Sequence, residues 1–155
     1  MTKENTCCFT GHRELYASKE SLTALVYHHV CVLYDRGIRN YCCGGALGFD
    51  TLAAQVVLEF RKDHPDARLV LILPCPEQAK FWHPEDVKVY EEIKSLADDV
   101  IYTHNRFTRF CMHLRNRRLV DESSVCISHL VKSTGGTAYT VDYAKKTGIK
   151  VINLI

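Results

Sequence analysis

The sequence predicts an α/β fold, with a single doubly wound, mostly parallel Rossmann-like sheet and helices on both faces. Six short apolar segments alternate with five helical stretches. The apolar segments are continuous rather than alternating, which is typical of strands buried on both faces. The chain has 155 residues and no linker, repeat or low-complexity segment. We therefore expect one domain, residues 1–155.

The expected strands are short apolar runs that end at glycine, proline or polar residues. They cover residues 6–10, 39–43, 68–73, 99–102, 124–128 and 151–155. Gly11 ends the first strand, Gly44 and Gly45 follow the second, and Pro74 closes the third. Because strand–helix–strand crossovers are right-handed, these strands should lie parallel in one sheet.

The expected helices show apolar residues at helical spacing. They cover residues 22–33, 52–60, 84–96, 108–122 and 137–146, and residues 78–82 could form one further turn. Gly37 and Gly148 are typical helix stops, and Pro84 suits a first helical turn.

Composition indicates a cytoplasmic protein. The formal net charge of +2 is too small to require a nucleic-acid or membrane partner. The longest apolar run, residues 69–73, is far shorter than a membrane span. The N-terminal MTKENTCC also lacks the apolar core of a signal peptide.

The eight cysteines favour buried thiols over disulfides or metal ligands. They are Cys7, Cys8, Cys31, Cys42, Cys43, Cys75, Cys111 and Cys126. No C-x-x-C and no zinc-finger spacing occurs, so we expect no metal site. Most lie in apolar segments, where cysteine acts as a small hydrophobic residue. Cys75, between two prolines, could instead be a reactive thiol, although no sequence feature indicates a lowered pKa.

The loop T-G-H-R follows the first strand. In a doubly wound sheet, ligands bind beyond the carboxyl ends of the strands. Gly11 would let the backbone approach a ligand closely, Arg13 could pair with a phosphate, and His12 could donate to one. The alternative is a surface turn with two solvated side chains.

The loop G-G-A-L-G-F-D follows the second strand. Gly44, Gly45 and Gly48 would aim backbone N–H groups at one point, and the next helix would add its dipole, so an anion is favoured. Neither the dinucleotide fingerprint nor a Walker A motif is present. Asp50 could hydrogen-bond a ribose hydroxyl or favour the positive end of the helix. The alternative is a structural turn.

Three further segments carry candidate residues. S-T-G-G-T, residues 133–137, opens the last helix and is a second candidate anion site, so two such loops favour a phosphorylated ligand. In the basic helix, Arg115, Arg117 and Arg118 cannot all face one way, and one can point into the site. Gln78 and Trp82 would share a face if helical, and Trp82 could stack on a base or cap the core.

Together these segments resemble the SLOG superfamily, the Rossmann-like group of the lonely-guy phosphoribohydrolases and DNA-processing protein A, and above all its small bacterial YpsA-type branch. The matching motifs are T-G-H-R, G-G-A-L-G-F-D-T-L-A-A, Q-A-K-F-W, R-N-R-R-L-V-D and G-G-T, in family order over nearly the whole chain. The resemblance implies a nucleotide-derived ligand, self-association as a dimer, and a sensor rather than an established enzyme. The candidate ligand-binding residues are Gly11, His12, Arg13, Gly44, Gly45, Gly48, Asp50, Gln78, Trp82, Arg115, Asn116, Gly135, Gly136 and Thr137.

The lonely-guy enzymes, which cleave the N-glycosidic bond of nucleoside monophosphates, differ at one position that matters. M-H-L-R-N resembles their M-H-x-R-K, which puts Arg115 on their arginine. Their P-G-G-x-G-T-x-x-E ends in a glutamate, but if Thr137 takes the place of their threonine, Thr140 stands at the glutamate position. A hydroxyl cannot replace a carboxylate in glycoside hydrolysis. We therefore expect that the protein is not an enzyme. If it is a hydrolase, we expect Arg115 to be a catalytic residue and Asp50 or Asp121 to supply the acid.

Three functions follow, of which the first is favoured. It is binding or sensing of a nucleotide or nucleotide-derived ligand, with no cofactor required. The second is phosphoribohydrolase activity on nucleoside monophosphates. The third is single-stranded nucleic-acid binding by basic residues such as Arg106 and Arg109, which the lone Trp82 and the nearly neutral chain disfavour.

Overall fold

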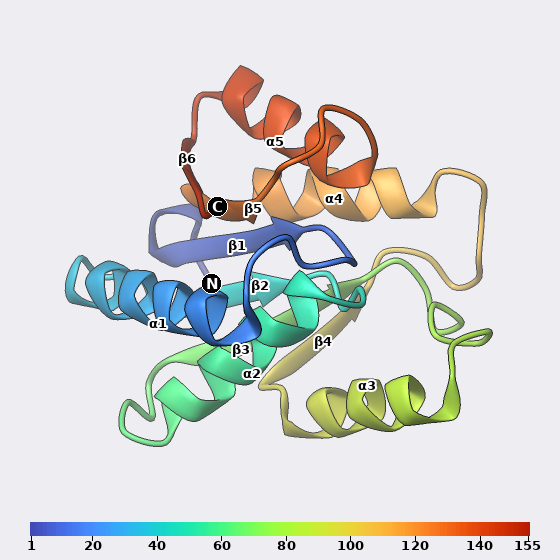
Figure 1. Cartoon of the computed structure of the whole chain (residues 1–155), viewed down its shortest axis with the longest axis horizontal. Coiled ribbons are helices and arrows are strands. Elements are labelled where there is room, and N and C mark those ends of the chain that lie inside the picture. Colours follow the sequence, from blue (N-terminus) through green and yellow to red (C-terminus); the bar gives the residue numbers. More distant parts are fainter.

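The predicted sheet is present in a computed structural model of the chain, which describes residues 1–155 (Figure 1). Six strands form one sheet in the order β4-β3-β2-β1-β5-β6, and every pair of neighbours is parallel. The strands are β1 Thr6–Gly11, β2 Asn40–Cys43, β3 Arg68–Leu73, β4 Asp99–Tyr102, β5 Val125–His129 and β6 Lys150–Asn153. The helices are η1 Lys3–Asn5, α1 Lys19–Asp35, α2 Phe49–Arg61, α3 Pro84–Leu96, α4 Cys111–Asp121 and α5 Gly136–Thr147. The α/β, doubly wound prediction is confirmed.

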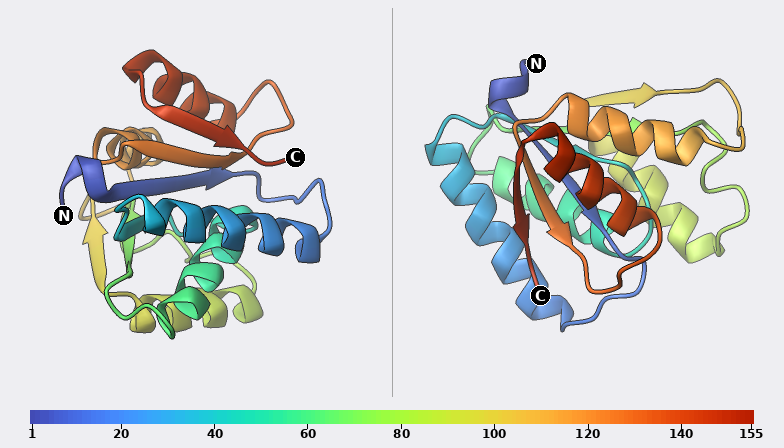
Figure 2. Two further views of the ribbon diagram at one scale, coloured as in Figure 1. Left: turned by 90° about the vertical axis from the view of Figure 1, so that its left-hand side faces the viewer. Right: turned by 90° about the horizontal axis from the view of Figure 1, so that it is seen from above.

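Helices cover both faces of the sheet, with α1, α2 and α3 on one side and α4 and α5 on the other (Figures 1 and 2). Successive strand residues supply the two cores. Phe9 and Tyr41 belong to the larger core under α1 to α3. Cys8 and Cys42, next to them in sequence, pack with Leu119 of α4 in the smaller core. Both faces are therefore apolar, which explains the continuous apolar strands.

Helix boundaries follow local capping chemistry. The helix α1 begins at Lys19 because the Ser18 hydroxyl accepts a hydrogen bond from the Ser21 N–H at 3.1 Å. Pro84 is the first residue of α3, as predicted. The basic helix begins at Cys111 rather than at residue 108. Residues 78–82 form hydrogen-bonded turns, not a helix, although the Trp82 N–H donates to the Ala79 carbonyl.

The cysteines are all free thiols, and every one except Cys31 is buried. The prediction of small hydrophobic residues is therefore confirmed. Burial raises the pKa of the Cys75 thiol. This is the opposite of what a reactive thiol requires, because the thiolate is the nucleophile.

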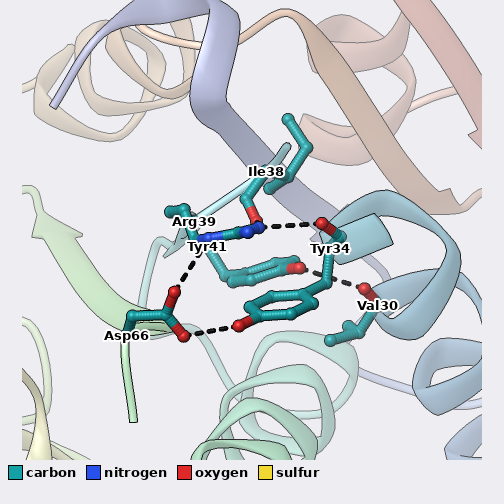
Figure 3. A network of polar contacts seen from close by, with 6 residues as sticks. All are labelled: Val30, Tyr34, Ile38, Arg39, Tyr41 and Asp66. Carbon is teal, nitrogen blue, oxygen red and sulfur yellow. Dashed lines mark hydrogen bonds and ion pairs between the residues drawn. The ribbon is translucent and has the colours of Figure 1, made fainter. Parts of the chain in front are cut away.

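A polar network joins α1 to the connections that precede β2 and β3 (Figure 3). Asp66 accepts hydrogen bonds from the Tyr34 hydroxyl at 2.5 Å and from Arg39 Nε at 3.1 Å. The Arg39 guanidinium also lies 3.8 Å from the centre of the Tyr34 ring. Nearby, the buried Tyr41 hydroxyl donates to the Val30 carbonyl at 3.0 Å. These contacts fix the end of the sheet where β2 and β3 begin.

The strand order places a topological switch point between β1 and β5. From β1 the chain builds outward through β2, β3 and β4, and then returns to build β5 and β6 on the other side of β1. The loops after β1 and β5 therefore lead to opposite faces and leave a crevice at their carboxyl ends. No helix of the structure is both long and apolar enough to cross a bilayer.

Candidate functional site

A cavity of about 340 Å³ opens at the carboxyl ends of the central strands. Its lining residues are Thr10, Gly11, His12, Arg13, Ala46, Asp50, Gln78, Met112, Arg115, Asn116, Gly136 and Thr137. Segments far apart in the chain thus meet there, as the resemblance implied. Of the predicted residues, Gly44, Gly45, Gly48, Trp82 and Gly135 do not line the cavity.

Arg115 is the arginine of α4 that reaches the cavity. Only 5% of its surface is exposed, while Arg117 is exposed and Arg118 pairs with Glu122 at 3.6 Å. The Arg115 guanidinium donates to the Gly44 carbonyl, and its Nε donates to the Asn116 side-chain oxygen at 2.8 Å. These hydrogen-bond partners are neutral, so only the nearby Asp50 carboxylate offsets the positive charge of Arg115, and it does so in part.

Gly44 makes room for this arginine. A Cβ atom at Gly44 would lie 2.7 Å from Arg115 Nη1, closer than atoms can pack. The Gly44 carbonyl also accepts from Gln78 Nε2 at 3.3 Å, and Tyr90 donates to Gln78 Oε1 at 3.5 Å. Gly44 therefore makes room for the Arg115 guanidinium, whereas the sequence suggested that it would contact an anion directly.

Asp50 lies buried in the first turn of α2. Its carboxylate accepts a hydrogen bond from the Ala46 N–H at 3.2 Å. Burial raises the pKa of Asp50 to about 6, whereas Arg115 and the N–H groups of Ala46 and Gly44 lower it. The carboxylate thus occupies the N-terminal end of α2. Of the two roles considered for Asp50, the structure shows the interaction with the positive end of the helix, and a hydrogen bond to a ribose hydroxyl stays a prediction.

The N-terminus of α5 forms the opposite wall. Gly135 caps the helix, and Gly136 and Thr137 of the first turn line the cavity. That turn has no acidic residue, so its N–H groups and dipole remain suited to an anion.

Thr140 lies one turn further along α5 and does not line the cavity. It is buried, and its hydroxyl donates to the Gly136 carbonyl at 2.8 Å. Asp142 is exposed and pairs with Lys146 at 2.9 Å. No carboxylate of α5 therefore reaches the site.

The T-G-H-R loop contributes differently from the sequence interpretation. Arg13 is exposed and lines the cavity. His12 Nε2 instead accepts hydrogen bonds from the N–H groups of Val131 at 2.9 Å and Lys132 at 3.2 Å. The His12 carbonyl accepts from the Phe49 N–H at 3.1 Å. His12 therefore connects β1 to the loops that precede α2 and α5.

Trp82 packs against the core. Its ring meets Tyr90 edge to face, with 5.2 Å between the ring centres, and it borders the larger core. Of the two roles considered for Trp82, the geometry favours capping the core.

The sequence interpretation missed Thr10, Ala46 and Met112 as lining residues. Each lies within or beside a motif that was singled out, T-G-H-R, G-G-A-L-G and M-H-L-R-N. Their positions were the available signal, because none of the three carries a charge. No three His, Cys, Asp or Glu side chains come together in a way that could hold a metal ion.

Comparison with known proteins identifies the family. The family model of YpsA, described as the YspA SLOG family, matches residues 8–151. The chain belongs to the YpsA family. The SPbeta prophage-derived protein YoqJ of Bacillus subtilis is 29% identical over 120 residues, which are 70% of this chain and 70% of YoqJ. A UPF0398 protein of Bacillus cereus is 26% identical over 132 residues, 83% of this chain and 72% of the relative.

Two solved structures of DNA processing protein A share the fold of this YpsA-family chain. The protein from Streptococcus pneumoniae has a TM-score of 0.67 at 16% identity, over 97% of this chain and 50% of that one. The protein from Helicobacter pylori, whose structure concerns its single-stranded DNA binding mode, has a TM-score of 0.67 at 21% identity, over 97% and 65%. The chain thus spans half to two thirds of these neighbours.

Proposed function

We propose that this YpsA-family chain binds or senses a nucleotide or nucleotide-derived ligand. The phosphate would lie at the N-terminus of α5, near Arg13 and Arg115, and a sugar hydroxyl would face Asp50. The observation that carries the proposal is the buried Arg115 guanidinium, which lines a polar cavity opposite a helix N-terminus without an acidic first turn.

Electrostatics favour an anion in this cavity. A buried charge is costly unless an opposite charge offsets it. Burial lowers the pKa of Arg115 because it disfavours the charged form of the side chain. The Asp50 carboxylate opposes this shift in part. The hydrogen-bond partners of Arg115 are all neutral: the Gly44 carbonyl, the Asn116 side-chain oxygen and the Met112 sulfur. A bound phosphate would supply the missing negative charge and accept charge-assisted hydrogen bonds.

The cavity also sets the size of the ligand. Its volume of about 340 Å³ lies at the lower end of small-molecule sites. This supports a mononucleotide, or the phosphate and ribose part of a larger ligand such as ADP-ribose.

Calorimetry with AMP, ADP-ribose, NAD and cyclic AMP tests this function. We expect at least one of them to bind, and Arg115→Ala to weaken binding tenfold or more, because a hydrogen bond to a charged group contributes about 1.5 to 3 kcal/mol. Arg117→Ala is the matched control, since Arg117 lies on the same helix but is exposed. Absence of binding by every probe, or equal losses in both variants, would contradict the proposal.

Binding without cleavage is the form of the proposal that the site supports. Asp50 is the one carboxylate that lines the cavity, and Thr140 offers none. A glycosidase normally requires two carboxyl groups across the scissile bond. We expect incubation with AMP to release no adenine by chromatography. Release that Asp50→Asn abolishes would instead support the phosphoribohydrolase alternative.

Single-stranded nucleic acid is a second candidate ligand, supported by three exposed aromatic rings. Phe81, Phe107 and Phe110 are 91%, 58% and 59% exposed on the loops before α3 and α4. The Glu77 carboxylate joins these loops by accepting from the Phe107 N–H at 3.2 Å. Lys80 lies 5.5 Å from the Phe81 ring centre, and Arg109 lies 5.3 Å from that of Phe110.

Exposed rings interleaved with cations are typical of surfaces that stack bases. The expectation against nucleic acid rested on a lone tryptophan and on the net charge. These phenylalanines weaken it, as does the single-stranded DNA binding of the Helicobacter pylori neighbour.

Fluorescence anisotropy with an oligothymidylate tests this candidate. Binding should weaken steeply with salt and fall in Phe107→Ala and Phe110→Ala, whereas Tyr27→Ala, a partly exposed aromatic of α1, should leave it unchanged. Binding insensitive to salt, or equal in all variants, would count against it.

A further inference from the structure

Two side chains hold the loop between β5 and α5: Asn153 pairs with the backbone of Leu130 at the start of the loop, and His12 holds the residues that follow. Its Nε2 accepts from the N–H groups of Val131 and Lys132 at 2.9 and 3.2 Å. No other side chain accepts a hydrogen bond from the backbone N–H groups of residues 131–135, although Lys132 also lies beside the Tyr16 ring, with Nζ 5.5 Å from the ring centre. The loop is exposed and leads directly into Gly136, where α5 begins. Whatever fixes this loop therefore fixes the N-terminus of α5.

The geometry determines the protonation state of His12. A ring nitrogen that accepts a hydrogen bond carries no proton, so the proton of neutral His12 lies on Nδ1. The second histidine of this region follows the same rule. His129 Nε2 accepts from the Tyr16 N–H at 3.1 Å, and its Nδ1 lies 2.7 Å from the Leu154 carbonyl, to which it donates. Two imidazoles thus connect the β1–α1 loop to the β5 side of the sheet.

We propose that His12 is a positioning residue, whose uncharged imidazole holds the β5–α5 loop so that the N-terminus of α5 faces the ligand. The proposal rests on the proposed function and deepens it. A proton on Nε2 would remove the acceptor of two backbone N–H groups and turn an attraction into a repulsion. Protonation of His12 should therefore release the loop and weaken binding of an anion, even though it adds a positive charge to the cavity.

The groups around His12 favour its neutral form. Its ring centre lies 6.1 Å from that of His129 and 5.4 Å from that of Tyr16, and Lys132 lies on the loop it anchors. Arg13 follows it in the same loop. Burial, together with His129 and Lys132, lowers the pKa of His12. No carboxylate is hydrogen-bonded to the ring to favour an imidazolium.

A glutamine variant separates the acceptor from the charge. In His12→Gln the side-chain oxygen reaches about as far as Nε2 and can accept hydrogen bonds, but it does not titrate. His12→Ala removes the acceptor. His28→Gln, on the exposed face of α1, controls for the loss of a histidine elsewhere.

The binding experiment uses ADP-ribose and calorimetry between about pH 8 and pH 5, the range in which histidine titrates. Because the pKa of His12 is lowered from 6.5, the affinity of the native chain relative to His12→Gln should stay level down to about pH 6.5 and then fall, by up to about tenfold at pH 5. Taking this ratio removes the effects of pH on affinity that both chains share. One of them is the protonation of Asp50, which strengthens binding of an anion on acidification and so opposes the effect of His12. His12→Ala should bind about tenfold more weakly at every pH, and His28→Gln should follow the native chain. A ratio that stays constant or rises would overturn the proposal.

Amide hydrogen exchange without ligand separates this proposal from the proposed function. At about pH 8 the Val131 and Lys132 amides should be protected in the native chain and in His12→Gln, and unprotected in His12→Ala. If ADP-ribose fails to bind the native chain, the proposed function loses that ligand, and this exchange result alone decides the role of His12. Equal protection in all three chains would overturn that role.

Discussion

At the scale of single residues, Arg115 and Asp50 define the chemistry of the cavity. Sequence reasoning narrowed the cation to three arginines on one helix, since helical spacing turns each in a different direction. The resemblance of M-H-L-R-N to the lonely-guy motif singled out Arg115, but spacing alone could not, because the choice depends on the space that Gly44 leaves in the loop after β2. The burial of Asp50 could not be predicted from the sequence either, because the residues around it include Arg115, which lies on another helix.

Asp50→Asn should stabilise the protein in a pH-dependent way. The fold raises the pKa of Asp50 from 3.8 to about 6, so it favours the protonated form, and this contribution to stability is lost as pH rises through about 6. Asparagine stays neutral and can still accept from the Ala46 N–H. At about pH 8 the free energy of unfolding should rise by up to about 3 kcal/mol, since a pKa difference of one corresponds to about 1.4 kcal/mol.

Urea unfolding at about pH 8 and about pH 4 measures this effect, and most of the gain should be lost at the lower pH, which is close to the ordinary pKa of 3.8. Asp142→Asn serves as the control because Asp142 is exposed. A variant of Asp50 that loses stability equally at both pH values would contradict the burial argument.

At the scale of elements, the loops do more packing than the sequence suggested. The strands were predicted to within two residues, because continuous apolar runs between turn residues are a strong local signal. The contacts between loops were not predictable in this way. His12 and Val131 are 119 residues apart, and nothing local indicates their hydrogen bond.

Gly48→Ala should disrupt the contact between the loops after β1 and β2. Gly48 has φ +79°, and a Cβ atom there would lie 2.1 Å from the Arg13 carbonyl oxygen. Gly37→Ala is the matched control, since Gly37 has φ +103° but open space around it. Strain alone should cost Gly37→Ala about 1 to 2 kcal/mol. Gly48→Ala should lose clearly more in urea unfolding, and equal losses would contradict this account of the contact.

At the scale of the whole molecule, the strand order creates the site. The switch between β1 and β5 brings together loops from both halves of the chain. Strand–helix alternation predicted a parallel sheet with a ligand at its carboxyl edge, which the cavity fits. Alternation alone did not give the order of the strands, since that depends on which helices share a face. Self-association as a dimer remains a prediction.

The central claim is that a nucleotide phosphate binds between α5, Arg13 and Arg115. Titration of the ¹⁵N-labelled chain with ADP-ribose, followed by NMR, tests it most directly. We expect saturable shifts of the Arg13, Gly136 and Thr137 amides, and loss of these shifts in Arg115→Ala. Absence of shifts at saturating ADP-ribose, or shifts confined to the exposed face of α1, would contradict it.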